Sequence, residues 1–172
     1  AGAVLWLCRK HYRSLKFTWS STAVVLGIVT FVVWLALIPS GAHRHDGWPA
    51  ALESVPMQWA AVWLFFRVVG YVLITPLAEE LAFRGFLTRR LLNADFQNVP
   101  AGMFSWLSFL ISSVLFGAFH GGMWLAGTLA GMSFAIALYY RRALGDAVQA
   151  HAITNGLIAV YAFATGQWSV WS

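Results

Sequence analysis

Long apolar runs, separated by short polar segments, dominate the chain. The first covers residues 17–38, which hold no charge and are long enough to cross a bilayer as a helix. A second run, 57–75, is interrupted only by Arg67, and Pro76 is predicted to break or kink the helix before helix-compatible sequence continues to about residue 92. Further apolar runs cover residues 103–119, 123–140 and 147–166. The pattern predicts an all-α polytopic membrane bundle with about five to six transmembrane helices.

The composition agrees with a membrane protein. The 172 residues fit a single domain, 1–172, in which 60% of residues are hydrophobic and only 10% are charged, against about 25% in a typical soluble domain. The net charge of +5 could indicate a nucleic-acid partner, but the basic residues are scattered between apolar runs. We therefore predict no nucleic-acid binding. Because the chain starts at Ala1 without a Met, we expect it to be a portion of a longer protein.

Three groups of basic residues predict the orientation of the chain. If successive spans alternate in direction, all three groups fall on one side, which the positive-inside tendency assigns to the cytoplasm. Residues 1–16 then form a basic cytoplasmic stretch, and the loop 39–56, with His43 and His45, falls on the other side. The basic groups are Arg9, Lys10, Arg13 and Lys16; Arg89 and Arg90; and Arg141 and Arg142.

Ionisable side chains inside the apolar runs are the candidates for chemistry. Each costs ~2.5–3.5 kcal/mol on insertion scales, so each needs an explanation. The candidates are Arg67, Glu79, Glu80, Arg84, His120 and His151. Three pairs are four residues apart, and a helix places such residues on one face. The pairs are Glu80 with Arg84, Phe116 with His120, and His151 with Asn155.

Helix rise indicates whether these motifs reach the same depth. At ~1.5 Å per residue, Glu79 lies roughly 16 Å from Arg90, and His151 lies roughly 14 Å from Arg142. His120 follows a helix of about 17 residues, or roughly 25 Å. Two of the motifs therefore agree in depth, and the third is compatible with them.

The first motif contains two adjacent carboxylates, Glu79 and Glu80, for which we predict different roles. Glu80 stands one turn before Arg84, the favourable order for an ion pair within a helix. Glu79 points elsewhere and is the carboxylate that remains free to act as a general base. Arg67 is interpreted as structural, a counter-charge to a carboxylate in the bundle. Phe116 is interpreted as packing that shapes the site.

These motifs resemble the signature of the CPBP family, the CAAX-processing and bacteriocin-processing intramembrane proteases of the ABI group. The family carries E-E-x-x-x-R, F-x-x-x-H and H-x-x-x-N motifs, in that order, on separate helices. All three match within about residues 57–165: Glu79-Glu80…Arg84, Phe116…His120 and His151…Asn155. The segments GDAVQAHAITN and TGQWSVW also resemble the protease portion associated with exosortase E systems.

The resemblance implies a CPBP-type intramembrane endopeptidase that forms no covalent intermediate. Glu79 would activate a water, assisted by His120, for attack on a peptide carbonyl. His151 and Asn155 would stabilise the resulting oxyanion. The supporting residues would be Glu80, Arg84 and Phe116. The implied setting is a bacterial inner membrane, with a membrane-associated protein or peptide as substrate, the lipid bilayer as surroundings and an exosortase-type sorting enzyme as partner.

Metal dependence is left open by the sequence. The family has also been described as metal-dependent, and Glu79, His120 and His151 could supply a site of two histidines and one carboxylate for zinc or another divalent metal. We expect no cofactor, because no H-E-x-x-H helix provides a preformed metal platform.

Two other functions compete with the peptidase. A catalytically inert membrane scaffold of the same fold would need neither Glu79 nor both histidines. An ion- or proton-coupled transporter could use intramembrane carboxylates and histidines as a relay, but it predicts internal repeats that the sequence lacks. A serine hydrolase is disfavoured, because the chain has no G-x-S-x-G motif.

Overall fold

The computed structural model describes residues 2–7, 9, 18–38 and 50–171, and within these ranges the regular elements are all helical. The predictions for His43 and His45, and for most of the basic stretch 1–16, lie outside the described residues. The α-helices are α1 (Gly2–Leu7), α2 (Ser21–Ala36), α3 (Ala50–Glu53), α4 (Met57–Val69), α5 (Thr75–Glu80), α6 (Thr88–Arg90), α7 (Trp106–Ala118), α8 (Trp124–Arg141) and α9 (Leu144–Thr165).

The described residues also contain short π-helical and 3₁₀-helical segments. Two π-helical segments, Gly70–Ile74 and Leu81–Leu87, join α4 to α5 and α5 to α6. The 3₁₀ turns are Phe96–Asn98, Gly121–Met123 and Trp168–Trp171.

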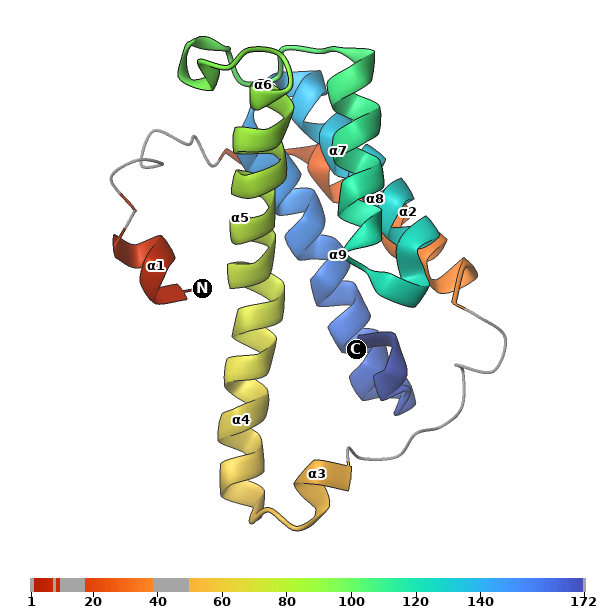
Figure 1. The fold of residues 1–172 in the computed structure, drawn as a ribbon. Coiled ribbons are helices and arrows are strands. Elements are labelled where there is room, and N and C mark those ends of the chain that lie inside the picture. Colours follow the sequence, from red (N-terminus) through yellow and green to blue (C-terminus); the bar gives the residue numbers. More distant parts are fainter. Residues whose placement is uncertain (1, 8, 10–17, 39–49, 172) are drawn as a thin grey trace.

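The segment Met57–Arg90 is one continuous helix of 34 residues, which forms the long column in Figure 1. Of the break or kink predicted at Pro76, the break is wrong. The preceding turn is widened instead: Thr75 N–H donates to the Gly70 carbonyl, five residues back rather than four. A widened turn accommodates a proline, which has no N–H to donate and whose ring crowds the preceding turn.

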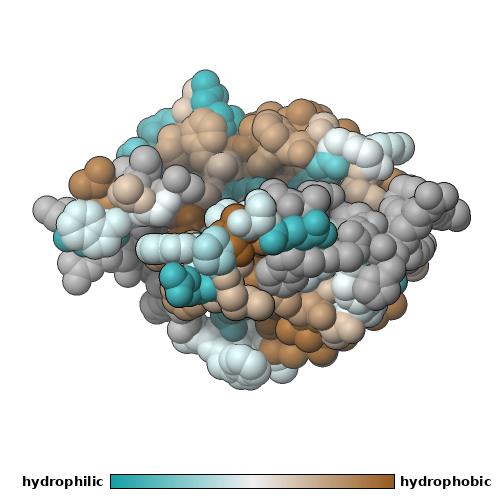
Figure 2. Space-filling view, turned by 90° about the horizontal axis from the view of Figure 1, so that it is seen from below, coloured by the Kyte–Doolittle hydropathy of each residue, from teal (hydrophilic) through white to brown (hydrophobic). Residues whose placement is uncertain are grey.

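The predicted helical membrane bundle is confirmed. Among the described residues, three helices are long and apolar enough to cross a bilayer: Met57–Arg90, Gly121–Arg141 and Leu144–Thr165. Two shorter apolar helices, α2 and α7, pack beside them. Large hydrophobic side chains are exposed along these helices, and in Figure 2, viewed from the end where α4 begins, hydrophobic side chains occupy much of the visible flanks. Lipid chains would cover such surfaces.

Helix α9 lies at the centre of the bundle and contacts α2, α8 and the long helix (Figure 1). Its contact with α2 depends on Gly27, where a Cβ atom would lie 2.8 Å from the Ala150 carbonyl oxygen. The Thr154 hydroxyl donates to the Gly27 carbonyl across the same contact, at 3.0 Å. A small residue therefore lets two apolar helices touch closely enough to hydrogen-bond.

The α7–α8 contact uses glycine in the same way. A side chain at Gly117 would collide with the Thr128 side chain and the Trp124 carbonyl oxygen, and one at Gly127 would press on the His120 ring at 2.9 Å. Gly121 has no atom within 4 Å of a built Cβ and has φ +53°, so it serves the turn after α7 rather than helix packing.

Four basic residues, Arg89, Arg90, Arg141 and Arg142, lie at one end of the bundle, where α6 and α8 end and α2 and α9 begin (Figure 1). Arg141 donates to the Trp19 carbonyl there, at 3.1 Å. The buried Asp146 carboxylate accepts from Ser20 Oγ at 2.8 Å and lies 3.5 Å from Arg141 Nη1. The second and third basic groups thus share one end, as the charge pattern predicts. Of the first group only Arg9 is described, so the common side of all three groups, and the assignment of this end to the cytoplasm, stay predictions.

Candidate active site

A cavity of about 200 Å³ lies inside the bundle and collects residues from all three sequence motifs. Its walls come from the long helix, α2, α7, α8, α9 and the 168–171 turn. Five of the predicted site residues line it: Glu79, Phe116, His120, His151 and Asn155. The other two, Glu80 and Arg84, lie behind the wall and are 0% and 1% exposed.

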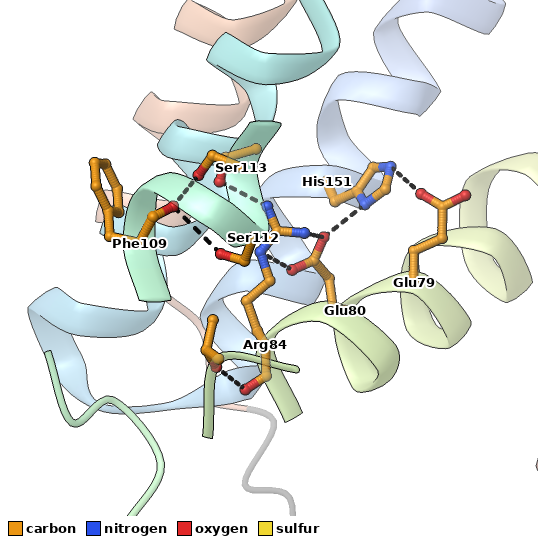
Figure 3. Close-up of polar contacts among 9 residues, drawn as sticks. Glu79, Glu80, Arg84, Phe109, Ser112, Ser113 and His151 are labelled. Atoms are coloured by element: carbon orange, nitrogen blue, oxygen red, sulfur yellow. Dashed lines mark hydrogen bonds and ion pairs between the residues drawn. The ribbon is translucent and has the colours of Figure 1, made fainter. Parts of the chain in front are cut away.

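The predicted Glu80–Arg84 ion pair is present, and it extends further than the sequence suggests. Arg84 Nη1 and Nε each lie 3.2 Å from a Glu80 carboxylate oxygen. His151 Nδ1 lies 3.0 Å from Glu80 Oε1, so the first motif is bonded directly to the third (Figure 3). Arg84 Nη2 donates to the Gly131 carbonyl at 2.6 Å, which ties the pair to α8. These additional hydrogen bonds help a buried charge pair to be tolerated, although Glu80 Oε2 and Arg84 Nε meet only as an ion pair, without a hydrogen bond among the described residues.

Glu79 is placed differently from its neighbour. Its side chain is 34% exposed, while the side chain of Glu80 is 0% exposed. Glu79 Oε2 lies 3.9 Å from His151 Nε2, beyond hydrogen-bond distance, and has no hydrogen-bond partner among the described residues (Figure 3). The carboxylate that the sequence predicts to be free therefore faces the cavity without a direct partner.

The His151 ring is held by two aromatic rings and by a hydrogen bond to Glu80. Phe134 stacks on it with ring centroids 4.5 Å apart and an interplanar angle of 14°, and Phe116 meets it edge-on at 5.6 Å. Because a carboxylate only accepts, Nδ1–H donates to Glu80 and Nε2 is the nitrogen that faces Glu79. The contact with Phe134 was not predicted, since a phenylalanine on an apolar run carries no signal of its partner.

His120 lies in the turn that follows α7, rather than in a helix. Its Nδ1–H donates to the Phe116 carbonyl at 2.7 Å, and its ring contacts the Phe116 ring at 4.8 Å and Trp34 of α2 edge-on at 5.6 Å. With Nδ1 acting as donor to a carbonyl, Nε2 is the nitrogen left for other contacts. Trp34 is a further cavity residue that the motifs did not indicate.

Asn155 is anchored by a contact that the sequence analysis missed. Its Nδ2 donates to the Tyr71 carbonyl, at 2.9 Å, in the π-helical segment of the long helix. In the i−5 spacing that Thr75 and Gly70 adopt, an N–H at position 76 would serve the Tyr71 carbonyl, and Pro76 has none. Pro76 was therefore the sequence feature that could have predicted this contact. A proline within a membrane helix leaves one backbone carbonyl without its N–H donor, and a side chain such as that of Asn155 can supply the donor instead.

Arg67 also lines the cavity, at the end of the long helix remote from the basic residues. The sequence analysis expected it to neutralise a carboxylate in the bundle. Within the described ranges, no carboxylate forms an ion pair with Arg67, so this expectation is wrong for those residues. Its recorded contacts are with the rings of Trp63 and Trp171.

The potential metal ligands do not fit a metal ion as they are placed. Over the part of the chain that is described, no three His, Cys, Asp or Glu side chains are grouped to hold one. This includes the set Glu79, His120 and His151. We therefore derive no step through a metal.

The fold and the site define a helical membrane bundle with an internal cavity at which three separated motifs meet. The family model described as type II CAAX prenyl endopeptidase Rce1-like matches residues 61–157. The chain belongs to this family, which is the CPBP family predicted from the motifs. It is therefore a membrane protein of a protease family. Searches of curated proteins and of solved structures give no match.

Proposed function

We propose that the protein is an endopeptidase that hydrolyses a peptide bond of a membrane-associated protein or peptide with a water activated by Glu79. One observation carries the proposal. Glu79 Oε2, which has no hydrogen-bond partner among the described residues, lies 3.9 Å from His151 Nε2 at a cavity of about 200 Å³. A general base needs this combination of a free acceptor and space for its water.

The reaction would proceed through a tetrahedral intermediate. Glu79 takes a proton from the water, the water oxygen attacks the carbonyl carbon, and negative charge develops on the carbonyl oxygen. His120 Nε2 would help to position the water, because its other ring nitrogen is already committed to the Phe116 carbonyl. The proton held by Glu79 then passes to the amide nitrogen as the carbon–nitrogen bond breaks.

His151 and Asn155 would stabilise the oxyanion. When doubly protonated, His151 keeps Nδ1–H on Glu80 and presents Nε2–H to the cavity. Asn155 uses one amide hydrogen on the Tyr71 carbonyl and has a second to donate. Preorganised donors of this kind contribute about 2.7–4 kcal/mol each to transition-state stabilisation.

The substrate and setting remain part of the proposal. Exposed hydrophobic side chains on the helices favour a substrate delivered within the bilayer. The family description names CAAX prenyl endopeptidases, which makes prenylated CAAX peptides one class to test. A bacterial inner membrane, the exosortase-associated subgroup and an exosortase-type partner rest on the resemblance of the C-terminal segments alone.

Cleavage by the purified chain in liposomes tests the proposal against its rivals. Single-span reporter peptides and prenylated CAAX peptides would be incubated with the protein, with and without a divalent-metal chelator, and the products identified by mass spectrometry. We expect one defined cut and no effect of the chelator. Asn155→Ala should lower kcat by about 10²–10³-fold, whereas Asn98→Ala, on an exposed loop residue, should leave it unchanged.

Each rival gives a different result in the same liposomes. Proton or ion flux without peptide cleavage would establish the transporter, in which the cavity residues form a relay. Peptide binding without cleavage or flux would establish the inert scaffold. Either outcome overturns the peptidase.

A further inference from the structure

The cavity has a second charged end, for which the proposed chemistry has no use. Arg67 stands on α4 twelve residues before Glu79, or about 18 Å along the same helix. Glu79 and Arg67 thus place a negative and a positive group at separate points of one cavity wall. The guanidinium has no carboxylate partner among the described residues.

Aromatic rings hold Arg67 at this position. Its Cζ lies 6.0 Å from the Trp63 ring centroid and 5.8 Å from that of Trp171. Trp171 is fixed in turn, because Tyr71 and Phe163 contact its ring at 5.5 Å. Cation–π contact orients a guanidinium but leaves its N–H groups free to donate.

Trp171 adds a second donor without an acceptor. Its side chain lines the cavity and is only 5% exposed, yet Nε1–H has no hydrogen-bond partner in the described structure. Buried indole N–H groups are usually bonded. An unbonded one beside a guanidinium that has no carboxylate partner in the described ranges therefore favours a ligand with acceptor oxygens.

We propose that Arg67 and Trp171 form an anion subsite that binds a carboxylate of the substrate. This inference rests on the proposed peptidase function and adds a specificity determinant to it. A guanidinium matches the two oxygens of a carboxylate in geometry and charge. The negative Glu79 disfavours the same group at the other end, so the subsite also fixes the direction in which a peptide lies.

The separation of the two ends sets the length of peptide between them. A fully extended chain spans ~3.3–3.6 Å per residue, so about 18 Å corresponds to roughly five residues of extended peptide. The carboxylate therefore belongs about five residues from the cleaved bond. It is either the substrate's own C-terminal carboxylate or an Asp or Glu side chain in that stretch.

Matched peptides test the subsite. Each pair would differ only in a free C-terminal acid against a carboxamide, or in Glu against Gln, placed about five residues from the cut. We expect the wild-type protein to show a KM about tenfold or more lower for the carboxylate member, with similar kcat. Comparison of the two pairs identifies which carboxylate is bound.

Substitutions at Arg67 and Trp171 test whether these two residues cause the preference for the carboxylate peptide. Arg67→Gln should abolish it, Arg67→Lys should keep part of it, and Trp171→Phe, which retains the ring but not the N–H, should reduce it. Arg90→Gln, an exposed arginine at the opposite end of the same helix, should keep the full preference. Equal KM values for both peptides in the wild-type protein, or a preference that survives Arg67→Gln, would overturn the subsite.

A binding readout separates this inference from the proposed chemistry. Fluorescent acid and amide peptides would be titrated onto Glu79→Gln protein in liposomes. Tighter binding of the acid that is lost with Arg67→Gln supports the subsite even if no peptide is cleaved. If Arg67 instead binds lipid phosphate, both peptides bind alike and Arg67→Gln only weakens retention of anionic lipid, a result that rejects the proposal.

Discussion

Glu80 Oε1 lies 3.0 Å from His151 Nδ1 and joins two motifs that are 71 residues apart. The same carboxylate is paired with Arg84 and is fully buried. The neighbouring glutamate, Glu79, makes neither contact and faces the cavity. Two adjacent carboxylates therefore have different surroundings: Glu80 contacts an imidazole and a guanidinium, and Glu79 lines the cavity.

Removal of the Glu80 carboxylate should affect stability and activity separately. Glu80→Ala leaves Arg84 buried without its partner, a change that typically costs about 3–5 kcal/mol. The double variant Glu80→Ala, Arg84→Met should recover much of this loss, since no charge is then left unpaired, but it should stay inactive because His151 is no longer oriented. Thermal unfolding in detergent and cleavage in liposomes measure the two effects. A double variant with wild-type activity would contradict the role given to Glu80.

Pro76 should help to position Asn155. Because Pro76 has no N–H, the Tyr71 carbonyl remains available as the acceptor for the Asn155 side chain. In Pro76→Ala the new N–H competes for that carbonyl, so Asn155 loses its anchor and kcat should fall about tenfold, while the helix becomes no less stable. Pro56→Ala, at the start of α4, is the matched control and should retain kcat. The idea fails if Pro76→Ala cleaves as fast as wild type while Asn155→Ala is impaired.

Gly117→Ala should destabilise the α7–α8 contact. The added methyl group would collide with Thr128 and with the Trp124 backbone, and such overpacking costs typically about 1–3 kcal/mol. Since His120 follows α7 directly, activity should fall as well. Gly122→Ala provides the comparison, because nothing lies within 4 Å of a Cβ there. Chemical denaturation of both variants is the measurement, and equal stabilities would refute the packing argument.

The Ser20–Asp146 contact should stabilise the basic end of the bundle. Asp146→Ala removes the acceptor of Ser20 Oγ and the partner of Arg141, and we expect a loss of about 1–3 kcal/mol. Asp95→Ala, in an exposed loop, should change stability by no more than about 0.5 kcal/mol. Activity of the folded Asp146→Ala fraction should be unchanged, because the contact lies outside the cavity.

Local contacts were the part of the site that the sequence could predict. Glu80 and Arg84 form their ion pair because four residues span one helical turn, and this geometry is independent of the rest of the fold. The spacing of His151 and Asn155 likewise placed both on the cavity side of α9.

Contacts between helices could not be predicted in the same way. Phe134 stacks on His151 only because α8 and α9 pack with a particular rotation, which apolar periodicity does not specify. The anchor of Asn155 on the Tyr71 carbonyl depends on a π-helical turn, a rare element with no strong sequence signature. Arg67 was misjudged because its partner was sought among the carboxylates of the chain itself.

The cleavage rate of Glu79→Gln protein tests the central claim most directly. Glutamine keeps the shape of the side chain but cannot take a proton from water, so the rate of reporter cleavage in liposomes should fall at least about a hundredfold. Glu53→Gln, an exposed glutamate of α3, controls for the loss of one negative charge and should cleave normally. Thermal unfolding should show that both variants are folded. A Glu79→Gln protein that cleaves at the wild-type rate would contradict the account.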